Sequence, residues 1–144
     1  MKKRLLLLLV AALPFSLFAQ TPTKGPLDGK IFEAEVTKEG KKKPMDPDEL
    51  KFAQGKYKSR NFTESYKFKN AAYLITSVDS TTTPGVMIYT WKVEALNDIK
   101  DMATWEGTIT GDDIEGTAKL VNKKGDSIFN CTFTGKLKKK PGKK

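Results

Sequence analysis

The chain has 144 residues, a formal net charge of +9 and no histidine. The missing histidine excludes Ser-His-Asp and Cys-His nucleophile pairs and every histidine-ligated metal site. The single cysteine, Cys131, excludes an internal disulfide, so stability has to come from a hydrophobic core. The length corresponds to about one domain.

Residues 1–19 have the three parts of a secretory signal peptide. Basic residues come first, an apolar run extends from Leu5 to Leu13, and Ala19 is the best small residue for cleavage. The alternative is a membrane anchor, but the apolar run is well short of the roughly 20 residues that span a bilayer. We therefore expect an exported protein, periplasmic or extracellular, with residues 20–26 as a flexible leader.

The first strand is predicted at residues 30–38, directly after this leader. Phe32, Ala34 and Val36 share one face there, and charged or hydroxyl residues take the other face. A polar loop rich in lysine follows at residues 39–48. The pattern is typical of a strand with one buried side.

A second strand begins at Leu50, and Gln54-Gly55 turns the chain into a third strand at Tyr57. Residues 60–71 follow no clean period of 2 or 3.6. A short helical turn or an irregular lid is predicted for this segment.

A fourth strand is predicted at residues 72–78, where β-favouring residues follow one another, and Pro84-Gly85 forms the next turn. A fifth strand follows at residues 86–95 because apolar and polar residues alternate again. Its expected inward residues are Met87, Tyr89, Trp91, Val93 and Ala95.

Residues 102–137 predict three further strands joined by two tight turns. Gly111 and Gly125 are each followed by aspartate, and this combination suits narrow hairpin loops. Alternation gives one apolar face to all three strands. That face comprises Trp105, Gly107, Ile109, Ile114, Gly116, Ala118, Leu120, Phe129, Cys131, Phe133 and Leu137.

The whole pattern predicts an all-β domain at residues 27–137, with roughly eight strands joined by short links. Such a series can close into an antiparallel up-and-down barrel. The alternative is an open meander or a two-sheet β-sandwich, because the sequence does not show whether the first and last strands pair. Gly107, Gly116 and Gly135 inside strands predict sharp curvature or close backbone approach. We expect a monomer.

Three stretches of the chain carry a family resemblance. Residues 50–59, 105–117 and 133–137 read LKFAQGKYKS, WEGTITGDDIEGT and FTGKL. In these stretches the chain resembles a group of small exported bacterial lipocalin-like proteins. The resemblance implies a calycin-type barrel, and the group has no settled activity.

No constellation of residues in the sequence predicts catalysis, a cofactor or a metal site. The paired carboxylates Asp48-Glu49 and Asp112-Asp113 are typical of loop and turn chemistry, rather than of general acid–base catalysis or calcium binding. Cys131 alternates with phenylalanines on the apolar face, which favours a buried inert thiol over a reactive one. We therefore expect no enzymatic activity.

Aromatic residues on the expected inward faces are the other candidate site. The ligand-lining candidates are Tyr57, Tyr89, Trp91, Trp105, Phe129 and Phe133. In an eight-stranded barrel, such side chains either fill the interior or surround one small ligand. If a ligand site exists, we expect it to open where Trp91 and Tyr89 meet residues 60–71.

Residues 138–144 are predicted to form a disordered basic tail. Its lysines are Lys138, Lys139, Lys140, Lys143 and Lys144. They offer a weak contact with an anionic surface. We expect no nucleic-acid binding, because an exported protein rarely meets nucleic acid.

Two hypotheses about function follow from these observations. In the first, the protein is an exported lipocalin-like binding protein that carries a small apolar ligand in its barrel. In the second, it is a ligand-free structural or interaction module of the cell envelope, which uses its outer face or its basic tail.

Overall fold

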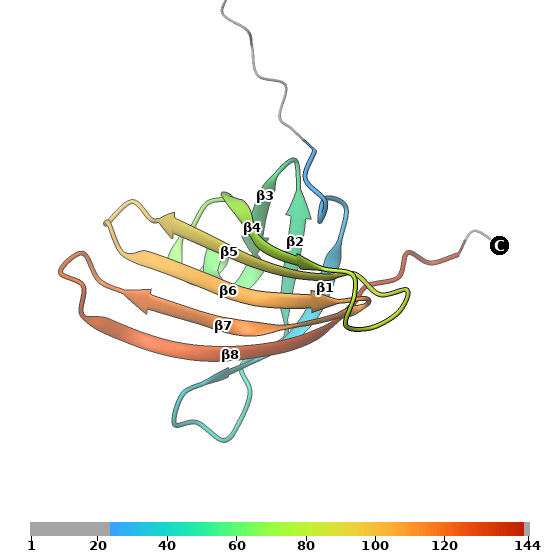
Figure 1. Cartoon of the computed structure of the whole chain (residues 1–144). Coiled ribbons are helices and arrows are strands. Elements are labelled where there is room, and N and C mark those ends of the chain that lie inside the picture. The colour runs from blue at the N-terminus through green and yellow to red at the C-terminus, as the bar shows by residue number, and fades with distance from the viewer. Residues whose placement is uncertain (1–23, 143–144) are drawn as a thin grey trace, which may run out of the picture.

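The structure is a computed structural model, and it describes residues 24–142. The predicted signal peptide lies outside the described residues. Within residues 24–142 the chain forms strands and one short helix (Figure 1). In chain order the elements are β1 (Ile31–Lys38), β2 (Asp48–Ala53), β3 (Lys56–Ser59), α1 (Arg60–Tyr66), β4 (Ala71–Asp79), β5 (Ile88–Leu96), β6 (Met102–Thr110), β7 (Asp113–Val121) and β8 (Ser127–Leu137).

The strands form a closed barrel in which each strand pairs antiparallel with its neighbours in the chain. β1 also pairs with β8, from Phe32 opposite Leu137 to Lys38 opposite Cys131. The prediction of an eight-stranded up-and-down barrel is therefore confirmed, and the open meander and the β-sandwich are wrong. Closure gives the first and last strands a partner, which removes the free edges of the sheet.

The helix α1 occupies the segment for which a helical turn or a lid was predicted. Ser59 caps its N-terminus, because the Ser59 hydroxyl accepts a hydrogen bond from the N–H of Phe62 at 3.2 Å. Lys67 ends the helix in the left-handed conformation, with φ of 60°. The helix is therefore about two turns long, with a defined cap at each end, and it connects β3 to β4.

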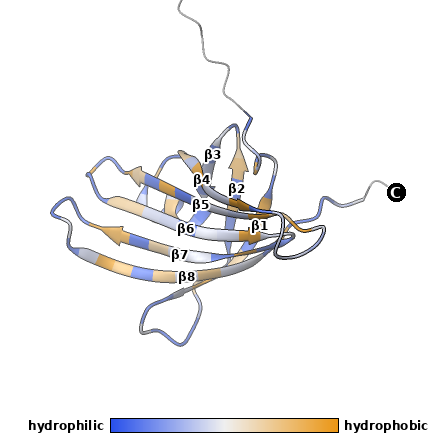
Figure 2. Cartoon of the chain, viewed as in Figure 1, coloured by the Kyte–Doolittle hydropathy of each residue, from blue (hydrophilic) through white to orange (hydrophobic). Residues whose placement is uncertain are grey.

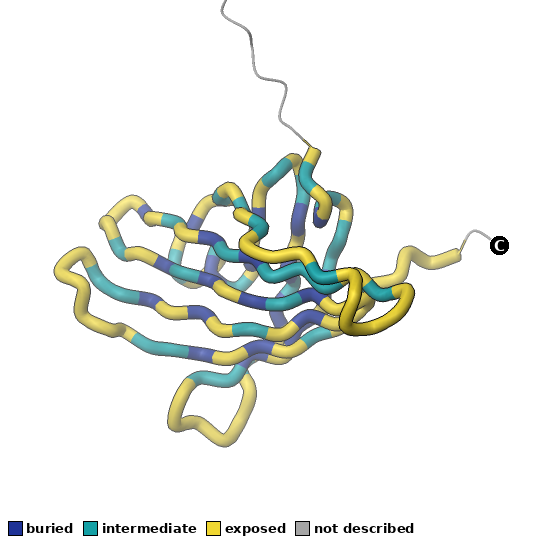
Figure 3. The backbone as a smooth tube through the Cα atoms, viewed as in Figure 1, coloured by how far each residue is buried: buried dark blue, intermediate teal, exposed yellow. Residues whose placement is uncertain are grey.

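The alternation predicted from the sequence is confirmed on most strands (Figures 2 and 3). On β6, for example, Trp105 and Ile109 are buried while Glu106 between them is exposed. The fifth strand starts later than predicted, at Ile88, because the turn before it runs further. Met87 therefore lies outside β5 and is exposed, which corrects its expected inward position.

Glycines on the inner face of the sheet make room for large rings. A Cβ added to Gly107 would lie 2.9 Å from the Trp91 ring, and one added to Gly116 would lie 2.7 Å from the Phe133 ring. At Gly135 an added Cβ would lie 2.4 Å from a carbonyl oxygen of β1. The predicted close backbone approach at these three glycines is confirmed.

We predict that Trp105→Ala lowers the free energy of unfolding by roughly 3–5 kcal/mol, because it removes a packed ring from the core. The Trp105 side chain is 3% exposed, and its ring centroid lies 5.2 Å from that of Tyr57 and 4.9 Å from that of Phe62. Urea melts measure the loss, which is a large share of the stability of an ordinary domain.

Glu106→Ala is the matched control on the same strand. Its exposed carboxylate pairs with the Lys92 ammonium at 3.4 Å. Such surface pairs contribute little, so we expect a change of no more than about 0.5 kcal/mol. If Trp105→Ala were as stable as the wild type, or Glu106→Ala the more damaging change, the inward position of Trp105 would be wrong.

Candidate functional site

The six ligand-lining candidates divide into a buried group and a peripheral group. Tyr57, Trp91, Trp105 and Phe133 are at most 3% exposed and face the barrel interior. Tyr89 and Phe129 are only half-buried. The structure therefore brings four of the six together in the core and leaves two near the openings.

The rings of the buried group pack directly against one another. The Trp91 ring centroid lies 5.1 Å from that of Tyr57, 5.1 Å from that of Phe52 and 6.1 Å from that of Phe133. These are ordinary separations for interacting aromatic pairs. Side chains thus fill the middle of the barrel.

One opening of the barrel is covered by the helix α1 and the residues after it. The Phe62 ring packs against Trp105, at 4.9 Å between centroids, and against Phe129, at 5.9 Å. Phe68 is buried as well and packs edge-on to Trp105 at 6.0 Å. The expected opening beside Trp91 and Tyr89 is therefore wrong, because the segment at residues 60–71 packs on Trp105 and Phe129.

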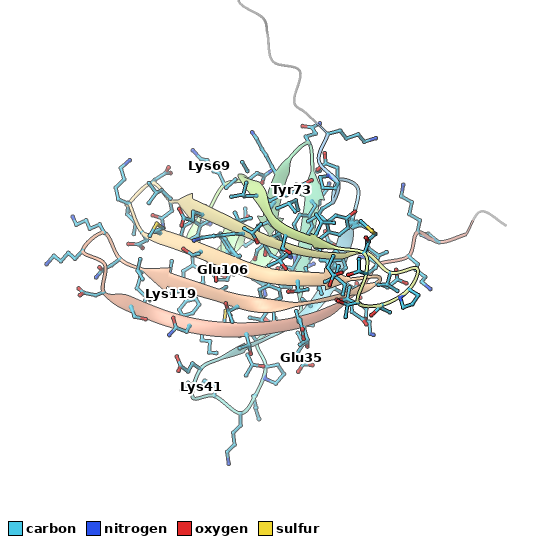
Figure 4. The ribbon with its side chains drawn as sticks, viewed as in Figure 1. Glu35, Lys41, Lys69, Tyr73, Glu106 and Lys119 are labelled. Atoms are coloured by element: carbon cyan, nitrogen blue, oxygen red, sulfur yellow. The ribbon has the colours of Figure 1, made fainter. Side chains whose placement is uncertain are left out.

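The segment before β1 covers the other opening of the barrel. Leu27 is fully buried, and the carboxylate of Asp28 beside it accepts hydrogen bonds from the N–H groups of Gly25 and Gly55 and from the Tyr73 hydroxyl. Tyr73 projects from β4 toward this segment (Figure 4). Tyr89 lines a separate surface hollow of about 290 Å³ together with Pro26.

Partial burial opposes ionisation of Asp28, but the hydrogen bonds from Gly55, Tyr73 and Gly25 outweigh it and hold the pKa of Asp28 below its usual value. Burial and the hydrogen bond to Asp28 raise the pKa of Tyr73 to about 12. Asp28 is therefore ionised at neutral pH. Its hydrogen bonds, here called the Asp28 clasp, attach residues 25–28 to the β2–β3 turn and to β4.

A small cluster of polar groups around Asp48 lies inside the otherwise apolar core. The buried Asp48 carboxylate accepts hydrogen bonds from the Ser59 hydroxyl and from the N–H of Asn61. Burial raises the pKa of Asp48. Burial raises the pKa of Tyr57 well above its usual value, and the nearby Asp48 carboxylate adds to this effect. Asp48 thus joins β2 to the start of α1.

Two buried polar atoms on the inward face have no hydrogen-bond partner among the described residues. They are the hydroxyl of Tyr57 and the indole N–H of Trp91. The two rings lie next to each other, with 5.1 Å between centroids. Both atoms can donate a hydrogen bond. Within the interior, these two donors therefore suit an acceptor atom of a bound ligand.

Cys131 is buried, as expected, and burial raises the pKa of its thiol to about 11. The thiol is therefore protonated at neutral pH, and a thiol is a much weaker nucleophile than a thiolate. Asp112 lies in the turn after Gly111, and Asp113 begins β7; they pair with Lys139 and Lys136, respectively. Within residues 24–142 no group of three acidic or cysteine side chains is placed to hold a metal ion, and no helix is long and apolar enough to cross a membrane.

The outer face carries two hollows of opposite charge. The first, about 520 Å³, lies over β2, β3 and the start of α1 and is lined by Lys51, Lys56, Lys58 and Arg60. The second, about 550 Å³, crosses β1, β6, β7 and β8. Its acidic lining residues are Glu33, Glu35, Asp113 and Glu115. Figure 4 shows charged side chains such as Glu35 and Lys119 on this outer face.

The start of the basic tail is attached to the barrel. The N–H of Lys138 donates to the carbonyl of Ile31, and its ammonium lies 3.3 Å from the carboxylates of both Glu33 and Glu49. Lys139 lies 3.9 Å from Asp112. The prediction of a tail without fixed contacts from residue 138 is thus wrong for these two lysines, and Lys143 and Lys144 lie outside the described residues.

The four basic residues of the first hollow were not singled out from the sequence. A signal for three of them was present, because Lys51, Lys56 and Lys58 occupy the outward positions of the strands predicted there. The pairing of β2 with β3, which the sequence only suggested, is what places their charges together.

This chain matches no protein-family model, no curated protein and no solved structure.

We predict that Asp28 stabilises the fold above its unfolded pKa and that this contribution is lost as the pH falls through the lower pKa of the folded state. The unfolded value is about 3.9, so the loss begins below about pH 4. Urea melts between neutral pH and pH 3 measure it. Asp28→Asn should be less stable than the wild type at neutral pH. Its free energy of unfolding should also fall less on acidification, because asparagine carries no charge.

Tyr73→Phe serves as the partial variant for the same measurement. It removes one of the hydrogen bonds to Asp28 and leaves those from Gly25 and Gly55. Its acid dependence should lie between that of the wild type and that of Asp28→Asn. If the free energy of unfolding of Asp28→Asn fell on acidification as much as that of the wild type, the ionised Asp28 carboxylate would not be what stabilises the fold.

Proposed function

We propose that this protein is a ligand-free interaction module of the cell envelope, which binds its partner on the outer face of the barrel. The observation that carries this proposal is the contact of Trp91 with Phe52, Tyr57 and Phe133, which occupies the middle of the interior. A carrier needs a concave apolar space for its ligand. In this barrel aromatic rings take that space.

The covers at the two openings support the same proposal. Phe62 and Phe68 pack on Trp105 at one opening, and Leu27 is fully buried beside the Asp28 clasp at the other. A guest molecule would have to displace one of these covers and then separate packed rings. Each step costs the apolar contacts of the side chain that moves.

Export is part of the proposal and is supported by the sequence pattern of residues 1–19, with its basic start, apolar run and Ala19. The periplasm or the extracellular space is the place of action that this pattern favours. In this setting a small barrel without an internal disulfide depends on its packed interior for stability.

A carrier of one small ligand is the second candidate function. It is favoured by the Tyr57 hydroxyl and the Trp91 indole N–H, which are buried without a hydrogen-bond partner among the described residues. The resemblance of residues 50–59 and 105–117 to lipocalin-like proteins also favours it. The guest would be mainly apolar, with one acceptor atom for these two donors.

The two candidate functions differ in what a native mass spectrum shows. We predict that protein purified from the envelope of its own host has the mass of the chain alone, and that fatty acids and retinoids do not quench its tryptophan fluorescence. The physical reason is that the rings around Trp91 leave the guest no space.

Tyr57→Phe and Glu106→Ala are the test variant and its matched control for this experiment. An adduct of one molecule per chain that is weakened by Tyr57→Phe and unaffected by Glu106→Ala would establish the carrier and overturn the proposed module. Tyr57→Phe removes only the hydroxyl, so the ring packing stays in place.

A further inference from the structure

The basic hollow over β2 and β3 places cations opposite one another. Lys51 on β2 lies directly opposite Lys58 on β3, and both side chains are exposed on the outer face. Lys56 comes from the outward position next along β3, and Arg60 is the first residue of α1. All four line one hollow of about 520 Å³.

Like charges directly opposite each other on a sheet are destabilising. Elsewhere in this barrel such a pair has a counter-ion: Glu33 faces Glu49 across β1 and β2, and the ammonium of Lys138 lies 3.3 Å from both. The pair of Lys51 and Lys58 has none, because no ion pair among the described residues includes either lysine. Within residues 24–142 this repulsive pair is thus left without an ion-pair partner.

The rest of the lining suits an anion. Arg60 donates one N–H to the carbonyl of Pro47 at 2.8 Å, which fixes its guanidinium and leaves other donors of the group free for a guest. Gln54 and Asn70 also line the hollow and carry side-chain amides. Two carboxylates, Glu49 and Glu64, line it as well, so four cations face two anions.

We propose that this hollow binds a phosphate-bearing anion through Lys51, Lys58 and Arg60. The proposal deepens the proposed function, on which it rests, by assigning a chemical class to the envelope partner. Ammonium and guanidinium groups together suit the several oxygens of a phosphate. The volume is that of a site for a larger molecule than one phosphate ion, such as a lipid headgroup or a segment of a phosphate polymer.

Two probes separate these sources of phosphate. The soluble probe is inorganic tripolyphosphate, followed by amide chemical shifts in nuclear magnetic resonance titrations of the full mature chain. The surface probe is co-sedimentation with vesicles of equal parts phosphatidylcholine and phosphatidylglycerol, compared with vesicles of phosphatidylcholine alone. Binding to the soluble probe alone points to a polymer or free phosphate, and binding to both points to headgroups.

The test variant is Lys51→Gln/Lys58→Gln, and its matched control is Lys123→Gln/Lys124→Gln, which removes the same charge from the exposed β7–β8 turn. We expect the test variant to bind about tenfold more weakly or worse, because each basic residue near an anionic surface adds a separate attraction. The control should stay within about twofold of the wild type. Lys139→Gln/Lys140→Gln is a second control, for attraction through the tail.

Urea melts separate loss of the site from loss of the fold. Removing the repulsion between Lys51 and Lys58 should leave the test variant as stable as the wild type or more so. Failure of the wild type to bind either probe, or equal weakening in the test and control variants, would overturn the site. The tryptophan readout is independent: an adduct in the interior would overturn the ligand-free module and leave the anion result intact.

Discussion

The contact between the Trp91 ring and the inner surface of the sheet at Gly107 is the constraint on which the rest of the structure depends. Trp91 is fully buried, and no Cβ at Gly107 would fit beneath it. Phe133 lies against Gly116 in the same way. Because the interior of an eight-stranded barrel has room for little more than its own side chains, these rings leave it filled. The interior is thereby a core like that of any packed domain.

Because the interior is filled, the groups that can bind a partner lie on the outer face of the barrel. The outer face separates its charges into an acidic hollow and a basic one, and Lys138 lies between them at Glu33 and Glu49. Hydrogen bonds to these two carboxylates raise the pKa of Lys138. The first residues of the tail therefore extend the barrel wall and neutralise one repulsive pair, while Lys51 and Lys58 keep theirs.

Different segments cover the two openings, and each segment is attached to the barrel through hydrogen bonds to a carboxylate. Asp28 attaches residues 25–28 to the barrel by accepting hydrogen bonds from backbone N–H groups and from Tyr73, and Asp48 attaches the start of α1 by accepting from Ser59 and from the N–H of Asn61. In each case a carboxylate accepts hydrogen bonds from backbone N–H groups beside a turn or at a helix start, where such groups lack regular partners. Apolar side chains can then cover the openings while these particular N–H groups keep hydrogen-bond partners.

Local features of the sequence determined the strands, the turns at Gly111 and Gly125, and the inward position of residues such as Trp105, because alternation and turn chemistry act between near neighbours. Tertiary structure alone decided three things. Pairing of β1 with β8 brings the first and last strands together and closes the barrel. The spacing of rings around Trp91 depends on the shape of that closed barrel and decides whether the interior is filled. The register of β2 against β3 brings Lys51 to Lys58, since charges become neighbours through pairing and not through their order in the chain.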